Sequence, residues 1–146
     1  WSVALTSGVK IYAAGSGSGM LSRPETVKEI IQLSGQAFPH VLYLGTATYD
    51  AAGPEDVQTR EFIAAGCTVH SLKVALSSPG EEELRRQFAK AEVVVVSGGN
   101  TLFAFDRWVR IGVDDLLRAA MQRDVVMSGG SAGAIVWFEG GHSDSM

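Results

Sequence analysis

Ser131 is the residue of this sequence whose surroundings best suit nucleophilic chemistry. It lies in the segment SGGSAGA, residues 128–134, directly after the apolar run Val125–Met127. Glycines two positions before and two positions after the serine form the nucleophile-elbow pattern, in which a strand turns sharply into a helix. The strained serine then stands at a helix N-terminus, where backbone N–H groups can stabilise an oxyanion. The alternative is a glycine-rich turn with an incidental serine, and the motif alone leaves both open.

A second glycine-rich turn, SGGNT at residues 97–101, follows the run Val93–Val96. An oxyanion hole needs an N–H donor besides the one that follows the nucleophile. A glycine turn at the end of a neighbouring strand exposes its backbone and can supply that donor. The other interpretation is a plain strand-to-helix turn with Asn100 or Thr101 as the N-cap. The cap is favoured for this turn alone, and the pairing with the serine turn strengthens the oxyanion-hole hypothesis.

A third polar segment, GGHSDS at residues 140–145, contains an acid and a histidine. Asp144 follows Ser131 at a spacing that allows one helix and a return toward the strand ends. A solvated loop acid is an equally weighted interpretation of Asp144. His142 is a candidate general base, although a histidine in a loop is more often simply exposed.

Two other features argue against nucleotide and metal sites. The segment GSGSGM at residues 15–20 is similar to a dinucleotide-binding loop, but that motif requires a glycine where Met20 stands. We therefore expect a substrate-facing loop or a simple turn over residues 15–19. Cys67 is the single cysteine, so no intrachain disulfide can form, and no metal-ligand spacing links it to the histidines. We expect Cys67 in or near the core.

Short apolar runs alternate with amphipathic stretches along the chain. The runs predict strands at 9–14, 40–45, 68–74, 93–96 and 125–127. Helices are expected from Pro24, over 54–65, from Pro79, over 113–122 and after Ser131. The four valines at 93–96 are typical of a strand buried on both faces. This alternation predicts an α/β domain with an open, mostly parallel sheet, whose ligands bind beyond the carboxyl ends of the strands.

Composition and charge narrow the classes of function. Hydrophobic residues make up 46% and charged residues 19%, and the 146 residues suit a single domain over 1–146. The net charge of −4, without a basic stripe, argues against nucleic acid and anionic membranes as partners. The longest apolar runs are strand-sized, and the opening residues lack the basic-then-apolar layout of a signal peptide. A cytoplasmic protein is therefore expected.

Together the two glycine turns make the sequence resemble the peptidase E (aspartyl dipeptidase) family. The resemblance is carried by AEVVVVSGGNT at 91–101 and GSAGA at 130–134. It implies a three-layer α/β sandwich with a mostly parallel central sheet, as in class I glutamine amidotransferase-like proteins. It also implies roles for five residues: Ser131 as nucleophile, the backbone N–H groups of Gly99 and Ala132 as oxyanion donors, Asp144 as a catalytic acid and Asn100 as a substrate-binding residue.

The activity that the resemblance implies is that of a serine dipeptidase. Its substrates would be small peptides with an N-terminal aspartate, it would need no cofactor or metal, and it is compatible with a homodimer. The catalytic histidine of the family lies further along than Met146, so we expect this chain to lack its C-terminal part. The alternatives are a non-catalytic amidotransferase-like binding module and a cyanophycinase-like hydrolase. An amidotransferase proper is disfavoured, because Ser131 stands where that class has cysteine.

Overall fold

Five strands form one sheet in the structure, a computed structural model that describes residues 8–145. The opening residues, on which the signal-peptide argument depends, lie outside the described residues. The strands are β1 (Lys10–Ala14), β2 (His40–Leu44), β3 (Thr68–Ser71), β4 (Val93–Val96) and β5 (Val126–Gly130). They are arranged in the order β1-β5-β4-β2-β3, and every neighbouring pair is parallel. The predicted parallel sheet is therefore confirmed.

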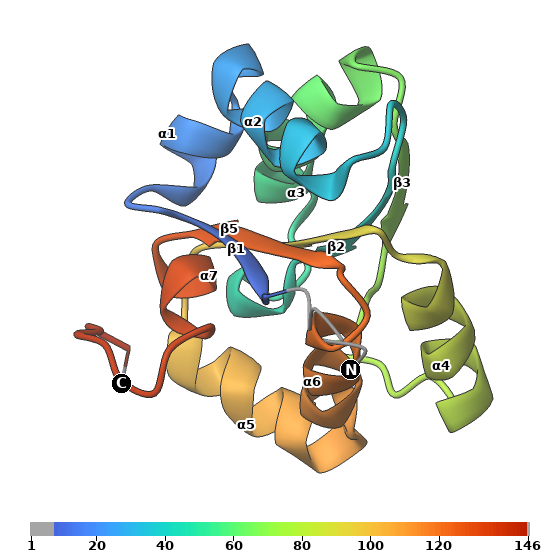
Figure 1. Cartoon of the computed structure of the whole chain (residues 1–146). Helices are drawn as coiled ribbons and strands as arrows, with labels where there is room; N and C mark the ends of the chain where they lie inside the picture. Colours follow the sequence, from blue (N-terminus) through green and yellow to red (C-terminus); the bar gives the residue numbers. More distant parts are fainter. Residues whose placement is uncertain (1–7, 146) are drawn as a thin grey trace, which may run out of the picture.

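Helices cover both faces of this sheet (Figure 1). One layer holds α1 (Gly17–Leu21), α2 (Pro24–Ser34) and α3 (Ala52–Ala64). The other layer holds α4 (Glu81–Lys90), α5 (Thr101–Ile111), α6 (Val113–Met121) and the short α7 (Ala132–Ile135). A 3-10 turn, η1 (Thr46–Thr48), follows β2. The result is the expected three-layer α/β sandwich.

The core lies on both sides of β4, because its four valines alternate between the two helix layers. Val93 and Val95 pack in a cluster with Ile30 of α2 and Phe62 of α3. Val94 and Val96 pack in a second cluster, together with side chains of α4, α5 and α6. All four valines are fully buried, as the sequence predicts. Cys67 is buried in the first cluster, which confirms its predicted place in the core.

Two predicted elements differ from the structure. The segment 15–19, predicted as a loop or simple turn, contains the start of helix α1. The helix forms here because the Ser16 hydroxyl caps it by accepting a hydrogen bond from the Gly19 N–H at 3.2 Å. The strand predicted over 68–74 ends at Ser71. One further ladder bond joins the Leu72 N–H to the Tyr43 carbonyl. The chain then leaves the sheet, and the Ala75 N–H donates instead to the Asp50 carboxylate at 2.7 Å.

Candidate active site

Ser131 occupies the turn between β5 and α7, with backbone dihedrals φ 56° and ψ −121°. This positive φ, with ψ outside the left-handed helical region, is unfavourable for a residue with a β-carbon and is typical of strained functional turns. The backbone around it is fixed, because the Ser131 N–H donates to the Ala14 carbonyl at 3.0 Å and its carbonyl accepts from the Ala134 N–H at 2.9 Å. Ser131 is exposed. The predicted strand-to-helix turn with unusual dihedrals is confirmed.

The glycines of this turn are required by contacts between backbones. A β-carbon at Gly130 would lie 2.3 Å from the Ser16 carbonyl oxygen, and one at Gly133 would lie 2.1 Å from the Val96 carbonyl oxygen. At Gly129 the corresponding distance, to the Gly133 carbonyl oxygen, is 2.4 Å. Side chains do not fit at such separations, so the turns after β1, β4 and β5 pack directly on one another.

The turn after β4 lies against Ser131. A β-carbon at Gly98 would be 3.3 Å from the Ser131 β-carbon, and β4 is the direct neighbour of β5 in the sheet. Gly99 has φ 115° and its α-carbon faces the Ala47 carbonyl. Within residues 8–145, the N–H groups of Gly99 and Ala132 donate to no protein acceptor. The predicted proximity of the two glycine turns is confirmed, and the oxyanion-hole role of these two N–H groups stays a prediction.

Asn100 is the N-cap of α5. Its side-chain oxygen accepts a hydrogen bond from the Phe103 N–H at 2.9 Å, and its own N–H donates to the Ala47 carbonyl at 2.8 Å. The side-chain amide nitrogen donates to the Tyr49 hydroxyl at 3.2 Å. The capping interpretation is therefore correct. The predicted substrate-binding role is not tested by these contacts, and the amide has one N–H left beyond them.

The segment that carries Asp144 folds back onto the start of α5, next to Asn100. The Thr101 N–H donates to the Ser145 hydroxyl at 2.8 Å. The Ser143 hydroxyl lies 3.2 Å from the Thr101 hydroxyl and 2.9 Å from that of Ser145. We call these three hydroxyls, from Thr101, Ser143 and Ser145, the hydroxyl clasp. It holds the exposed Asp144 at the same edge of the sheet as Ser131, as the spacing predicted, while the catalytic role of Asp144 stays a prediction.

The three histidines do not contact Ser131. His40 begins β2 at the amino end of the sheet, and His70 is an exposed residue of β3. His142 is exposed in the segment that leads to the clasp. Among the hydrogen bonds of the described chain, none joins a histidine nitrogen to the Ser131 hydroxyl. This agrees with the expectation that no histidine nitrogen of this chain bonds the Ser131 hydroxyl, while the absence of a catalytic histidine from the chain stays a prediction.

Sequence reasoning missed the polar residues at the carboxyl end of β2 and just after it. Tyr43 is buried and its hydroxyl has no partner in the described structure. Burial raises the pKa of Tyr43, and the negative charge of Glu55 raises it further. Thr48 lies beside it, with its hydroxyl 3.5 Å from that of Ser97. A signal was available, because Thr46, Thr48 and Tyr49 follow a predicted strand at its carboxyl end, where ligands of such sheets bind.

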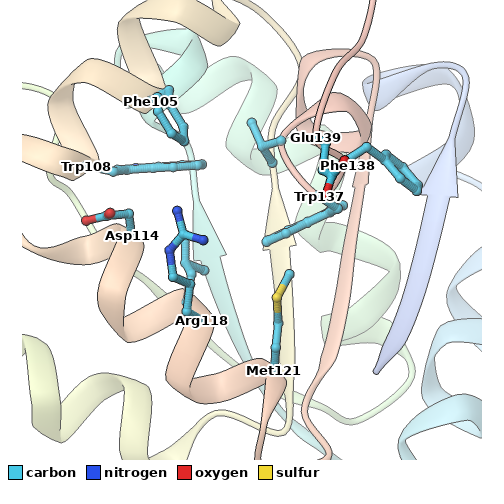
Figure 2. A pocket seen from close by; sticks show the side chains of 10 residues that line it. Phe105, Trp108, Asp114, Arg118, Met121, Trp137, Phe138 and Glu139 are labelled. Carbon is cyan, nitrogen blue, oxygen red and sulfur yellow. The ribbon is translucent and has the colours of Figure 1, made fainter. Parts of the chain in front are cut away.

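One well-formed cavity lies away from Ser131. It has a volume of about 430 Å³ and is lined by residues of α5 and α6 and of the segment that follows α7. Figure 2 shows the indole rings of Trp108 and Trp137 on opposite walls, with the Arg118 side chain between them. None of the lining residues belongs to the glycine turns. We therefore place the candidate site at Ser131, where the strained backbone lies against the glycine turn that follows β4, and not in this cavity.

A parallel α/β sandwich with a strained, exposed serine between a strand and a helix defines a protein with a nucleophile elbow. The chain belongs to peptidase family S51, the family of peptidase E, because the sequence model of that family matches residues 11–146. It is 31% identical over 140 residues to the uncharacterized peptidase YgaJ of Bacillus subtilis (strain 168), covering 94% of this chain and 60% of YgaJ. It is 33% identical over 75 residues to the uncharacterized peptidase PM1590 of Pasteurella multocida (strain Pm70), covering 51% of this chain and 35% of PM1590.

Two crystal structures share the fold. One is from Listeria monocytogenes EGD-e and is described as a candidate peptidase E protein. It has a TM-score of 0.72 and 20% identity, over 89% of this chain and 62% of that chain. The other, a peptidase from an acI-B1 Actinobacterium, has a TM-score of 0.69 and 18% identity, over 86% and 55%. The chain thus spans little more than half the length of these relatives.

No helix among residues 8–145 is long and apolar enough to cross a membrane. No group of three or more histidine, cysteine, aspartate or glutamate side chains within 8–145 is arranged to hold a metal ion.

Proposed function

We propose that the protein containing this chain is a serine peptidase-type hydrolase that cleaves small peptides, with dipeptides bearing an N-terminal aspartate as its substrates. The observation that carries the proposal is the backbone of Ser131, whose φ of 56° places an exposed hydroxyl at the start of α7. Such strain persists only where the surrounding structure enforces it. Here the Ser131 N–H bond to Ala14 and the close-packed glycines enforce it.

In the proposed mechanism the Ser131 hydroxyl oxygen attacks the carbonyl carbon of the scissile peptide bond, and its proton passes to a general base. The N–H groups of Gly99 and Ala132 donate to the oxyanion of the tetrahedral intermediate. A donor of this kind contributes about 3–4 kcal/mol of transition-state stabilisation. The intermediate collapses, the amine leaves with the proton returned by the base, and water hydrolyses the acyl-enzyme by the same route in reverse.

Within residues 8–145, no general base is hydrogen-bonded to the Ser131 hydroxyl. A serine hydroxyl is a weak nucleophile without a base within hydrogen-bond reach. His40 and His70 belong to strands away from the elbow, and His142 has no hydrogen bond to Ser131. We propose that the base comes from outside these 146 residues, which cover 60% of YgaJ. Asp144, held at the site edge by the hydroxyl clasp, is the proposed acid.

The test is carried out on the gene product at its natural length and, in parallel, on the 146 residues alone. A fluorophosphonate probe should label the natural-length protein on Ser131, located by mass spectrometry, and the same protein should hydrolyse aspartyl dipeptides. Ser131→Ala should lose both activities. Ser34→Ala is the matched control, because Ser34 ends α2 and bonds only locally, to the Ile31 carbonyl and the Gln36 N–H. The 146-residue chain should show no hydrolysis, because the proposal places the base outside these residues.

The outcomes separate the alternatives. Hydrolysis that survives Ser131→Ala, or labelling confined to another serine, contradicts the proposal. Cleavage of cyanophycin with no cleavage of dipeptides would favour the cyanophycinase-like alternative. Peptide binding without labelling or turnover would identify a non-catalytic module.

A further inference from the structure

Tyr49 is an exposed aromatic residue beside the glycine turn that flanks Ser131. It follows η1 at the carboxyl end of β2 and adopts φ 56°, a conformation that is uncommon for a bulky residue. About half of the residue, 51%, is exposed. Its ring packs on Phe103 with 4.7 Å between the ring centroids, so the ring is held in place while one side of it faces solvent.

The direction of the Tyr49 hydroxyl proton follows from the cap of α5. The Asn100 side-chain oxygen is committed to the Phe103 N–H at 2.9 Å. Since the backbone N–H needs an acceptor, the amide cannot be flipped, and its NH₂ group must point at Tyr49. The Tyr49 oxygen therefore accepts the 3.2 Å hydrogen bond from Asn100. Its own proton is left to donate, and it has no protein acceptor within the described part of the chain.

The position of this donor suits a ligand bound at Ser131. Gly98 lies against the Ser131 β-carbon, and Asn100 is two residues further along. Two residues of chain span at most about 7 Å. The backbone of Asn100, whose side chain orients Tyr49, is thus within about a dipeptide's length of the turn that contacts the nucleophile.

We propose that Tyr49 is a substrate-binding residue whose phenol donates a hydrogen bond to a carbonyl or carboxylate oxygen of a peptide bound at Ser131, and that Asn100 is the positioning residue that turns this proton toward the substrate. The inference rests on the proposed function for the location of the peptide, but not on turnover. It also changes the expected role of Asn100, which acts on the substrate through Tyr49.

The test measures peptide binding to the natural-length protein in a Ser131→Ala background, so that hydrolysis is not required. The dipeptide Asp-Leu is titrated by calorimetry. Tyr49→Phe keeps the ring and its packing on Phe103 and removes only the donor, so Kd should rise about 3- to 10-fold, the effect of one hydrogen bond. Tyr12→Phe is the matched control. The Tyr12 hydroxyl donates to Glu29 of α2 at 2.7 Å, and its removal should leave Kd unchanged.

A second variant tests the positioning role. Asn100→Asp keeps an oxygen for the helix cap, but its other carboxylate oxygen accepts the Tyr49 proton and withdraws it from the ligand. Kd should rise as in Tyr49→Phe, and the double variant should be no weaker than either single one, because both remove the same hydrogen bond. In the active protein the same variants should raise KM more than they lower kcat.

Three results would overturn the inference. The first is a Kd of the Tyr49→Phe protein within about twofold of that of the Ser131→Ala parent. The second is that the increases in Kd add in the double variant. The third is that the Ser131→Ala parent does not bind Asp-Leu. Binding that depends on Tyr49 in a protein that does not hydrolyse peptides would contradict the proposed function and leave this inference standing.

Discussion

Replacing Gly133 by alanine should damage both the stability of the protein and the reactivity of Ser131. The new β-carbon would lie 2.1 Å from the Val96 carbonyl oxygen and 2.8 Å from that of Ser97. An ordinary carbon–oxygen contact is about 3.3 Å, so α7 and the end of β4 must separate by about 1.2 Å. Both partners are backbone and neither can rotate away, so we expect a loss near the upper end of the range for overpacking, about 3 kcal/mol.

The functional effect of Gly133→Ala follows from the same displacement. Ser131 and the Ala132 N–H stand at the start of the helix that must move, and a misplacement of about 1 Å can reduce a rate about 100-fold. The free energy of unfolding is measured by urea titration with tryptophan fluorescence, and reactivity by the rate of fluorophosphonate labelling. Gly140→Ala is the matched control, because no atom lies within 4 Å of its β-carbon position. A Gly133→Ala protein that unfolds and labels like the control would refute the steric reasoning.

Three further predictions concern the elbow, the clasp and one ion pair. Ser131→Gly should have a free energy of unfolding about 1 kcal/mol higher than Ser131→Ala, because glycine tolerates φ 56°. An equal or lower free energy of unfolding would argue against backbone strain at Ser131. Ser145→Ala removes the acceptor of the Thr101 N–H. Hydrogen exchange of the Thr101 amide should therefore accelerate, and the free energy of unfolding should fall by about 0.5–1 kcal/mol. Unchanged exchange would mean that the hydroxyl clasp does not form in solution. Burial raises the pKa of Glu55, but hydrogen bonds from Lys73 and Ser71, together with the charge of Lys73, outweigh it and hold that pKa below its ordinary value. The Lys73–Glu55 pair therefore stabilises the fold at pH values above the ordinary pKa of a glutamate, and this stabilisation is lost as the pH falls through the lowered pKa of Glu55. Lys73→Met should reduce the dependence of the free energy of unfolding, measured in urea, on acid pH. An identical dependence in both proteins would contradict the prediction.

The strands were predictable because each is a short apolar run next to a glycine turn or a helix signal. The run 93–96 matches β4 residue for residue, and 40–45 differs from β2 by one residue. The order of the strands was not predictable, since four buried valines show that β4 has covered faces and not which strands flank it. Helix α1 was missed because three glycines in its neighbourhood favour a turn, whereas the Ser16 cap and the packing of Gly17 on Gly98 stabilise a helix.

Part of the candidate site was also predictable from the sequence, and part was not. Ser131 was found because a local motif fixes both its turn and its exposure. The neighbouring glycine turn was found because it ends the next predicted strand. The Tyr49–Asn100 bond and the hydroxyl clasp join residues far apart in the sequence, for example Thr101 and Ser145. No periodicity or short motif reports such pairs, and only the folded arrangement shows them.

The pairing of β1 with β5 has a consequence for the order in which the molecule folds. Lys10 pairs with Val126 and Ala14 with Gly130. The hydrogen bonds of β1 to the sheet therefore cannot form until β5 is available. Contacts this distant in sequence are slow, because the intervening chain must first lose its conformational freedom. During synthesis on the ribosome, β2, β3 and β4 can associate while β5 is still being made. The Ser131 conformation, which depends on the bond from its N–H to Ala14, is therefore expected to form only after β5 has been inserted between β1 and β4.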